Sequence, residues 1–200
     1  MHVKEVVNKK KNFVVLISGG GTNLQALIDA INMGKILDCS ISLVISDRKG
    51  AYGLTRANNA GIPTLYMPFK RKLEDRASYD KRLSLEIEKH KPSHIFCLGF
   101  LHIFTQNFVD FFKARIINLH PALPHTFVGL NCIEKQYEAL QKDQIIECGV
   151  MAHYIDSTLD EGPVIKVEKA CVDKSLSLED FTTLIHSMEH KLVVDVATSL

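Results

Sequence analysis

The sequence predicts an α/β protein built on a mostly parallel, Rossmann-like, doubly wound sheet with an antiparallel C-terminal addition. Apolar runs of strand length alternate with amphipathic helical stretches over residues 13–120, an order typical of parallel sheets that helices cover on both faces. A glycine-rich loop at 18–23 joins the first run to the first helix. Two later runs, 148–154 and 164–172, have no helical stretch between them, so we expect them to pair antiparallel.

The individual elements follow from the spacing of apolar residues. Residues 13–17 form a continuous apolar run, which is typical of a strand buried on both faces. The first helix presents one apolar face, formed by Leu24, Leu27, Ile28 and Ile31. Further strands are predicted at 41–46, 64–67, 94–99 and 116–120, and further helices at 52–60, near 79–90, at 104–112 and near 133–140. A capping box at 177–180 predicts the start of the last helix.

The bulk composition is that of an ordinary globular protein. The chain has 200 residues, of which 46% are hydrophobic and 24% are charged, and its formal net charge is +1. This balance gives no general attraction to nucleic acid or to an anionic membrane. No apolar run approaches the ~20 residues of a membrane span, and the five cysteines include no C-x-x-C pair. We therefore expect a reduced, cytoplasmic protein with a tail at 1–12 and a single domain at 13–200.

The glycine loop is the first candidate binding site. Its three consecutive glycines let the backbone approach a ligand closely, and the N-terminus of the following helix offers free N–H groups that suit a phosphate. Thr22 and Asn23 add a hydroxyl and an amide. The loop has neither the G-x-G-x-x-G nor the G-K-[ST] spacing, which favours a small phosphorylated molecule over a dinucleotide. A tight turn without a ligand is the alternative.

A second candidate site lies where the strand 116–120 ends. Asn118 and His120 point to the same side of an extended strand, and Pro121 ends the strand because it cannot donate to the sheet. Open α/β sheets bind ligands at this edge, where an amide and an imidazole can stabilise an oxyanion. Asp160, with His153 on the strand before it, could raise the pKa of His120 above its unperturbed ~6.5. A purely structural role for each histidine stays open at this point.

Two other kinds of catalytic site are disfavoured. A Ser-His-Asp hydrolase would carry a G-x-S-x-G elbow, and the sequence has none. The histidines and cysteines also lack the spacing of zinc ligands.

Four segments resemble the glycinamide ribonucleotide transformylase family, and the resemblance extends from Val14 to about His190. The segments are 15–26 around the glycine loop, 51–57, 118–123 with its Asn-x-His-Pro, and His153 together with 159–163. Members of this family move the formyl group of 10-formyltetrahydrofolate to the amine of glycinamide ribonucleotide in purine synthesis, without a metal. The resemblance implies the formyltransferase fold, with a phosphate-binding half at 13–113 and a catalytic, folate-binding half at 114–200.

The resemblance also implies roles for individual residues. The substrate phosphate is expected on Gly21, Thr22 and Asn23. The ribose and glycinamide are expected beside residues of the last helix, with Glu189 as the main contact: His186, Ser187, Met188 and Glu189. Folate is expected beside Arg76, Leu101, His102, Ile103, Phe104, Asn118, Asp156, Ser157, Thr158, Leu159 and Asp160. Asn118 and His120 are expected at the formyl carbon, where Asp160 keeps His120 protonated and His153 positions Asp160.

The sequence departs from the common family pattern at two of these places. His102 stands where many members have Arg, a change that matters for folate only if the side chain, and not the backbone, recognises it. Glu161 replaces a common glycine beside Asp160. Both departures fall in segments expected to hold the folate.

Other functions are known on the same scaffold, and each predicts a different sequence. A tRNA or amino-sugar formyltransferase would be expected to carry a further module, and a formyltetrahydrofolate hydrolase a further N-terminal domain. A phosphometabolite-binding module without catalysis would not need Asn118, His120 and Asp160 together. We expect two small-molecule substrates, no nucleic acid or membrane partner, and a monomer or weak homodimer.

Overall fold

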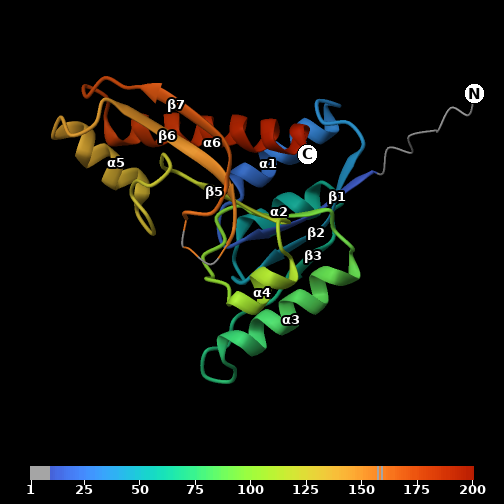
Figure 1. The fold of residues 1–200 in the computed structure, drawn as a ribbon. Helices are drawn as coiled ribbons and strands as arrows, with labels where there is room; N and C mark the ends of the chain where they lie inside the picture. The colour runs from blue at the N-terminus through green and yellow to red at the C-terminus, as the bar shows by residue number, and fades with distance from the viewer. Residues whose placement is uncertain (1–9, 157, 159) are drawn as a thin grey trace, which may run out of the picture.

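The protein forms one seven-stranded sheet with helices on both faces (Figure 1). The computed structural model describes residues 10–156, 158 and 160–200. In chain order the elements are β1 (Lys11–Ile17), α1 (Thr22–Asn32), β2 (Cys39–Ser46), α2 (Tyr52–Asn59), β3 (Thr64–Tyr66), α3 (Arg76–Lys89), β4 (His94–Cys97), α4 (Gln106–Phe111), β5 (Ile116–His120), α5 (Cys132–Gln141), β6 (Glu147–Tyr154), β7 (Val164–Cys171) and α6 (Leu178–Ser199).

The strand order confirms the predicted architecture. The sheet runs β3-β2-β1-β4-β5-β6-β7; β1 to β5 are parallel, and β6 is antiparallel to both β5 and β7. The one sheet spans both expected halves, 13–113 and 114–200, without interruption. Element ends differ from the prediction by a few residues: the strand expected at 94–99 ends at Cys97, and the helix expected at 104–112 is only Gln106–Phe111.

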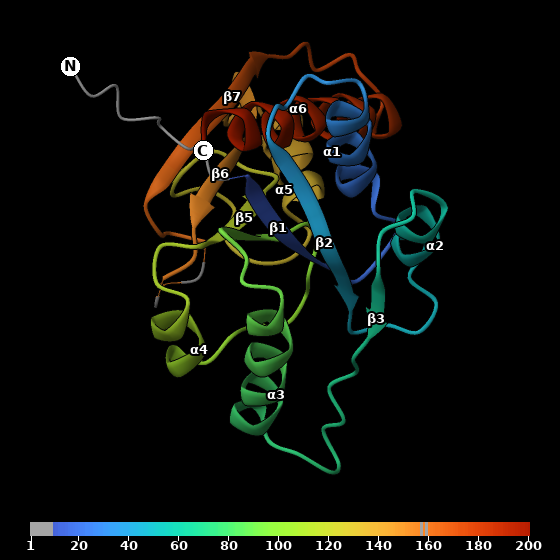
Figure 2. The same ribbon diagram turned by 90° about the vertical axis from the view of Figure 1, so that its right-hand side faces the viewer.

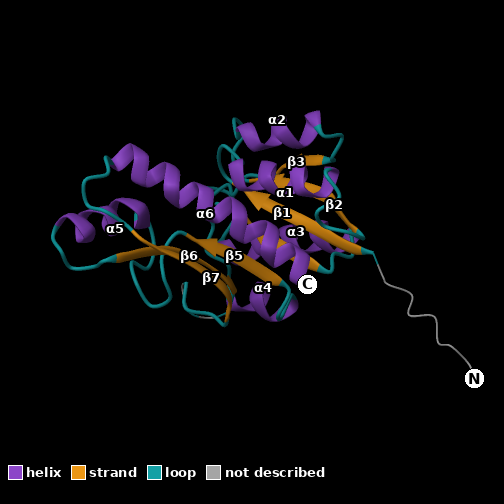
Figure 3. Ribbon diagram, turned by 90° about the horizontal axis from the view of Figure 1, so that it is seen from above, coloured by secondary structure: helices purple, strands orange, loops and turns teal. Residues whose placement is uncertain are grey.

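Two helical layers sandwich the sheet, as Figures 2 and 3 show from two further directions. On one face α1, α2, α5 and α6 pack against alternate strand residues such as Phe13, Val15 and Ile17. On the other face α3 and α4 pack against the intervening residues Val14 and Leu16. Every residue of 13–17 is therefore buried, which explains why β1 is a continuous apolar run rather than an alternating one.

The order of the strands places a crevice next to β1. The chain leaves β1 toward β2 and β3, then crosses back to β4 on the other side. Connections that leave in opposite directions open a crevice at the carboxyl ends of the two strands, where doubly wound proteins bind ligands. The glycine loop follows β1 and the segment 98–105 follows β4, so both border this crevice.

The opposite end of β1 lies beside the end of the last helix. Lys11 Nζ, at the start of β1, donates to the carbonyl oxygen of Thr198 near the end of α6, at 3.4 Å. No helix in the described part of the chain is long and apolar enough to cross a membrane.

Candidate active site

A cavity of about 860 Å³ lies at the carboxyl ends of β1, β4 and β5. It brings together most of the residues predicted to form a site: Gly21, Thr22, Asn23, Leu101, His102, Ile103, Phe104, Asn118, His120, His153, Asp156, Thr158, Asp160, His186 and Glu189. The glycine loop and α6 border one part, the segment after β4 borders another, and β5 lies between them. The cavity can therefore hold two molecules that meet at β5.

Some predicted residues do not line this cavity. Ser187 turns its hydroxyl to the carbonyl oxygen of Leu184, and Met188 packs into the core. Residues three apart share one face of a helix, which is why His186 and Glu189 face the cavity while the two residues between them do not. Arg76 is exposed at the start of α3 and does not line the cavity. Ser157 and Leu159 lie outside the described residues.

The pairing of β5 with β6 creates the centre of the site. The antiparallel register sets Asn118 directly opposite His153, and Asn118 Nδ2 donates to His153 Nε2 at 3.1 Å. His153 Nδ1 lies 3.0 Å from the carbonyl oxygen of Tyr154, to which it must donate. The ring is thus neutral, with its hydrogen on Nδ1. Burial lowers the pKa of His153 below its ordinary 6.5, in agreement with this tautomer.

Asp160 joins the centre from the loop between β6 and β7. Its Oδ2 lies 3.5 Å from His120 Nδ1 and accepts from the backbone N–H of Gly129 at 3.1 Å. Its Oδ1 lies 3.3 Å from Asn118 Nδ2. Asp160 has a left-handed backbone, with φ of 55°, an uncommon conformation that Asp tolerates better than most residues. The predicted grouping of Asn118, His120, His153 and Asp160 is therefore present in space.

The donors within this cluster differ from the expectation. Both N–H groups of the Asn118 amide are directed at protein acceptors, His153 and Asp160. The Nε2 atom of His120, by contrast, is buried and has no hydrogen-bond partner among the described residues. A buried polar atom without a partner is rare. His120 Nε2 is consequently the group of this cluster best placed to meet a ligand atom.

The glycine loop has the geometry of an anion cradle. Gly21 has φ of 71° just before α1, and its backbone packs so closely on Gly53 that a Cβ at residue 21 would lie 2.6 Å from Gly53 Cα. The backbone N–H groups of residues 20–23 make no hydrogen bond within the described chain. Arg56, a residue that the sequence pattern does not single out, donates its Nε–H to the carbonyl oxygen of Gly20 at 2.9 Å. This contact places a cation beside the cradle.

A histidine–carboxylate pair on α6 faces the same part of the cavity. His186 Nδ1 lies 2.9 Å from Glu189 Oε2, and the Glu189 side chain is buried. The hydrogen bond to Glu189 raises the pKa of His186 above its ordinary 6.5. The pair can thus present both an acceptor carboxylate and a positive charge to a polar ligand.

The segment after β4 forms the other wall. Backbone N–H and C=O groups of residues 102–104 make no hydrogen bond to the rest of the described chain. The side chains of Leu101 and Ile103 are about half exposed. Extended backbone with free donors and acceptors, flanked by apolar side chains, suits the edge of a flat heterocycle. Across the described ranges no group of three or more His, Cys, Asp or Glu side chains is placed to hold a metal ion.

Comparisons with known proteins agree with this geometry. The model of the formyl transferase family matches residues 11–197. Phosphoribosylglycinamide formyltransferase of Schizosaccharomyces pombe is 40% identical over 193 residues, which cover 92% of this chain and 93% of the relative. The Escherichia coli enzyme of the same name is 35% identical, covering 90% and 82%. A trifunctional purine biosynthetic protein of Chironomus tentans is 36% identical over 182 residues, which are 90% of this chain and 13% of that protein.

Solved structures give the same result. The phosphoribosylglycinamide formyltransferase of Coxiella burnetii, in complex with CHES, superposes with a TM-score of 0.87 at 37% identity, covering 95% of this chain and 86% of that one. The glycinamide ribonucleotide transformylase 1 of Geobacillus kaustophilus superposes with a TM-score of 0.87 at 27% identity, covering 95% and 98%. The chain therefore belongs to the formyl transferase family and, within it, to the phosphoribosylglycinamide formyltransferases.

Proposed function

We propose that this protein transfers the formyl group of 10-formyltetrahydrofolate to the amine of N1-(5-phospho-D-ribosyl)glycinamide, a step of purine synthesis. The observation that carries the proposal is the buried Nε2 of His120, which has no hydrogen-bond partner in the part of the chain that the structure describes. It lies in a cavity that has an anion cradle on one side and a wall of free backbone groups on the other. The substrates are two small molecules, and a cytoplasmic location fits the free cysteines of the chain.

The ribonucleotide would lie between the glycine loop and α6. The free N–H groups of residues 20–23 would bind the phosphate, helped by the N-terminus of α1. Arg56, held at Gly20, adds positive charge nearby. Glu189, with its carboxylate at the cavity, would accept hydrogen bonds from the ribose hydroxyls. This orientation directs the glycinamide amine toward β5.

The folate would lie against the wall formed by residues 101–104. The free backbone groups of 102–104 offer alternating donors and acceptors to a pteridine edge. The half-exposed side chains of Leu101 and Ile103 would contact its apolar faces. Asp156 and Thr158, which line the cavity on the way to Asp160, would cover the bound ring. The formyl group then lies at the end of β5, next to His120.

The proposed reaction is a direct acyl exchange. The amine nitrogen bonds to the formyl carbon, and the carbonyl electron pair moves onto the oxygen. His120 Nε2–H stabilises this oxyanion. Asn118 Nδ2 gives up its 3.3 Å contact with Asp160 and donates to the oxyanion as well. The intermediate collapses when the bond from carbon to the folate nitrogen breaks, and the proton lost by the amine ends on that nitrogen. Asp160 holds the His120 ring so that Nε2 faces the reacting carbonyl.

An absorbance assay of folate deformylation tests the function. We expect the purified protein to produce tetrahydrofolate from 10-formyltetrahydrofolate only when the ribonucleotide is present. Formyl loss at an unchanged rate without the ribonucleotide would instead identify a hydrolase. Formyl transfer to an amino sugar or to methionyl-tRNA, with none to the ribonucleotide, would also contradict the proposal.

A further inference from the structure

The wall expected to bind folate is held at two points by side chains from other elements. At its first point the backbone N–H of Leu101 donates to Ser18 Oγ at 3.0 Å, and Ser18 Oγ in turn donates to Asp47 Oδ1 at 2.6 Å. Ser18 follows β1 and Asp47 follows β2. The start of the wall is thus tied to the ends of two central strands.

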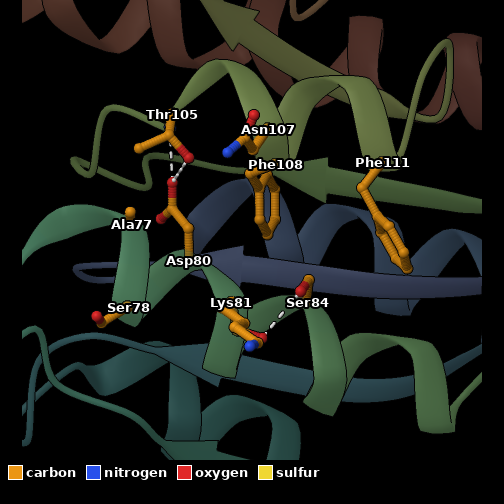
Figure 4. A pocket seen from close by; sticks show the side chains of 9 residues that line it. All are labelled: Ala77, Ser78, Asp80, Lys81, Ser84, Thr105, Asn107, Phe108 and Phe111. Atoms are coloured by element: carbon orange, nitrogen blue, oxygen red, sulfur yellow. Dashed lines mark hydrogen bonds between the residues drawn. The ribbon is translucent and has the colours of Figure 1, made fainter.

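The second point of attachment is Asp80 of α3. Its Oδ1 lies 2.6 Å from His102 Nε2, and its Oδ2 accepts from the backbone N–H and the hydroxyl of Thr105 at 2.6 and 2.7 Å. The side chains of Asp80 and His102 are only 3% and 5% exposed. Figure 4 shows Asp80 reaching Thr105 across the space between α3 and α4, where both residues also line a groove of about 350 Å³.

The ring of His102 is committed to this interior contact. It packs edge-on against Phe69, Tyr79 and Phe104, at centroid distances of 5.5, 4.8 and 5.5 Å. With Nε2 bonded to Asp80 and the side chain almost fully buried, the part of His102 that remains for a ligand is its backbone. Asp80 thus fixes two residues, His102 and Thr105, at the two ends of the stretch of unpaired backbone.

From this arrangement we infer that Asp80 is a positioning residue for the folate co-substrate. It does not touch the ligand; it holds residues 102–104 extended so that their N–H and C=O groups meet the pteridine together. The inference rests on the proposed function. Nothing in the sequence pattern singles out Asp80, whose chemistry is visible only in the folded chain.

A carboxylate is suited to this role because three donors converge on it. An ionised Asp accepts at both oxygens and has no N–H of its own, and hydrogen bonds to a charged acceptor are stronger than neutral ones. An Asn of the same shape would turn its NH₂ group either toward Thr105 or toward His102 Nε2. In the first case the partly buried Thr105 N–H loses its acceptor, and in the second the imidazole must move its hydrogen to Nδ1 and the charge-assisted hydrogen bond is lost, so the hold on the wall weakens in both cases.

The experiment compares Asp80→Asn with the wild type by calorimetric titration of each ligand separately. The ligands are a stable folate analogue of 10-formyltetrahydrofolate and the ribonucleotide. We expect the Kd for the folate analogue to rise about tenfold, the effect of losing one good hydrogen bond, and the Kd for the ribonucleotide to stay within about twofold. Hydrogen exchange should become faster in peptides that cover residues 101–105.

A matched control separates positioning from general destabilisation. Asp75 is the N-cap of the same helix; its side chain accepts from the Ser78 N–H at 2.7 Å and makes none of the hydrogen bonds that hold the wall. Asp75→Ala should weaken α3 yet leave the folate Kd unchanged. If Asp80→Asn does not fold, Thr105→Val removes one of the three hydrogen bonds and should give a smaller loss in the same direction.

Two results would overturn the inference. One is a folded Asp80→Asn or Thr105→Val protein that binds the folate analogue as the wild type does. The other is an equal loss of affinity for both ligands, when Asp75→Ala, compared at the same stability, shows the same loss. A wild-type protein that binds no folate analogue at all would instead refute the proposed function.

Discussion

Asn118 Nδ2 lies 3.1 Å from His153 Nε2, and this contact links the tautomer of one residue to the orientation of the other. Burial favours the neutral form of His153, in which Nδ1 donates to the Tyr154 carbonyl and Nε2 accepts, so the Asn118 side chain presents its NH₂ group. The same NH₂ group then reaches Asp160. A buried neutral histidine on β6 therefore fixes the position of the carboxylate beside His120.

Removing the central donor or its carboxylate should abolish most activity. We expect His120→Ala and Asp160→Ala each to lower kcat by ~10²–10³, the usual effect of losing one oxyanion donor, while both variants remain folded. Steady-state assays with both substrates, together with circular dichroism, measure this. Asp143→Ala, which removes a surface carboxylate paired with Lys174, serves as the control. Turnover near that of the wild type in either site variant would contradict the assigned roles.

The free energy of unfolding should decrease at acidic pH, in part because of His153. Its pKa in the folded protein is lowered by burial, so the unfolded chain binds more protons as the pH falls below about 6.5. The contribution to stability is therefore present above pH 6.5 and is lost as the pH falls toward the folded-state pKa. We expect His153→Gln to show a flatter decline in urea midpoint between pH 7.5 and 5.5. An unchanged slope would exclude this contribution.

Ribonucleotide binding should weaken at alkaline pH through His186. Its pKa is raised by the hydrogen bond to Glu189, so the imidazolium persists above pH 6.5 and is lost as the pH rises through that raised value. Above pH 7 the substrate phosphate is already mostly a dianion, but the glycinamide amine titrates there as well, near the ~7.7–8.0 of an α-amino group, so a variant is needed to assign the change to the protein. We expect the Kd of the wild type for the ribonucleotide to increase as the pH rises above 7 and His186 loses its charge. His186→Lys, which stays charged, should remove the trend, and a persistent trend in that variant would assign it elsewhere.

The contact between Gly21 and Gly53 should be critical for the phosphate cradle. Gly21→Ala combines a left-handed φ with a Cβ 2.6 Å from the Gly53 Cα, so we expect a loss of about 1–3 kcal/mol in stability and clearly weaker ribonucleotide binding. Gly34→Ala is the matched control, since Gly34 has φ of 70° with nothing within 4 Å. Equal effects of the two substitutions would show that only the backbone angle matters.

The regular parts of the fold could be predicted from the sequence because their signals are local. The apolar run at 13–17 indicated a central strand, and the missing helix between 154 and 164 indicated the antiparallel pair, as the sheet confirms. The alternation along the strand 116–120 placed Asn118 and His120 on one side. Helical spacing could have shown that Ser187 and Met188 face away from His186 and Glu189.

The rest depends on contacts between distant segments. Asp80 pairs with His102 and Thr105 across more than 20 residues, and the link from Ser18 to Leu101 spans 83. No periodicity or motif encodes such pairs, because each forms only when separate elements pack together. The acceptor that Asn118 finds on His153 likewise follows from the register of β5 against β6, which the sequence does not reveal.

The contact between Lys11 and Thr198 bears on how this protein tolerates being joined to others. Both residues lie at the end of β1 remote from the reaction cavity, so a neighbouring domain attached at either place would extend away from the entrance for substrates. This geometry is compatible with the Chironomus tentans protein, in which the matching segment makes up 13% of a much longer polypeptide. It also favours circular permutation, since a short tether could join α6 to β1 without disturbing the chemistry.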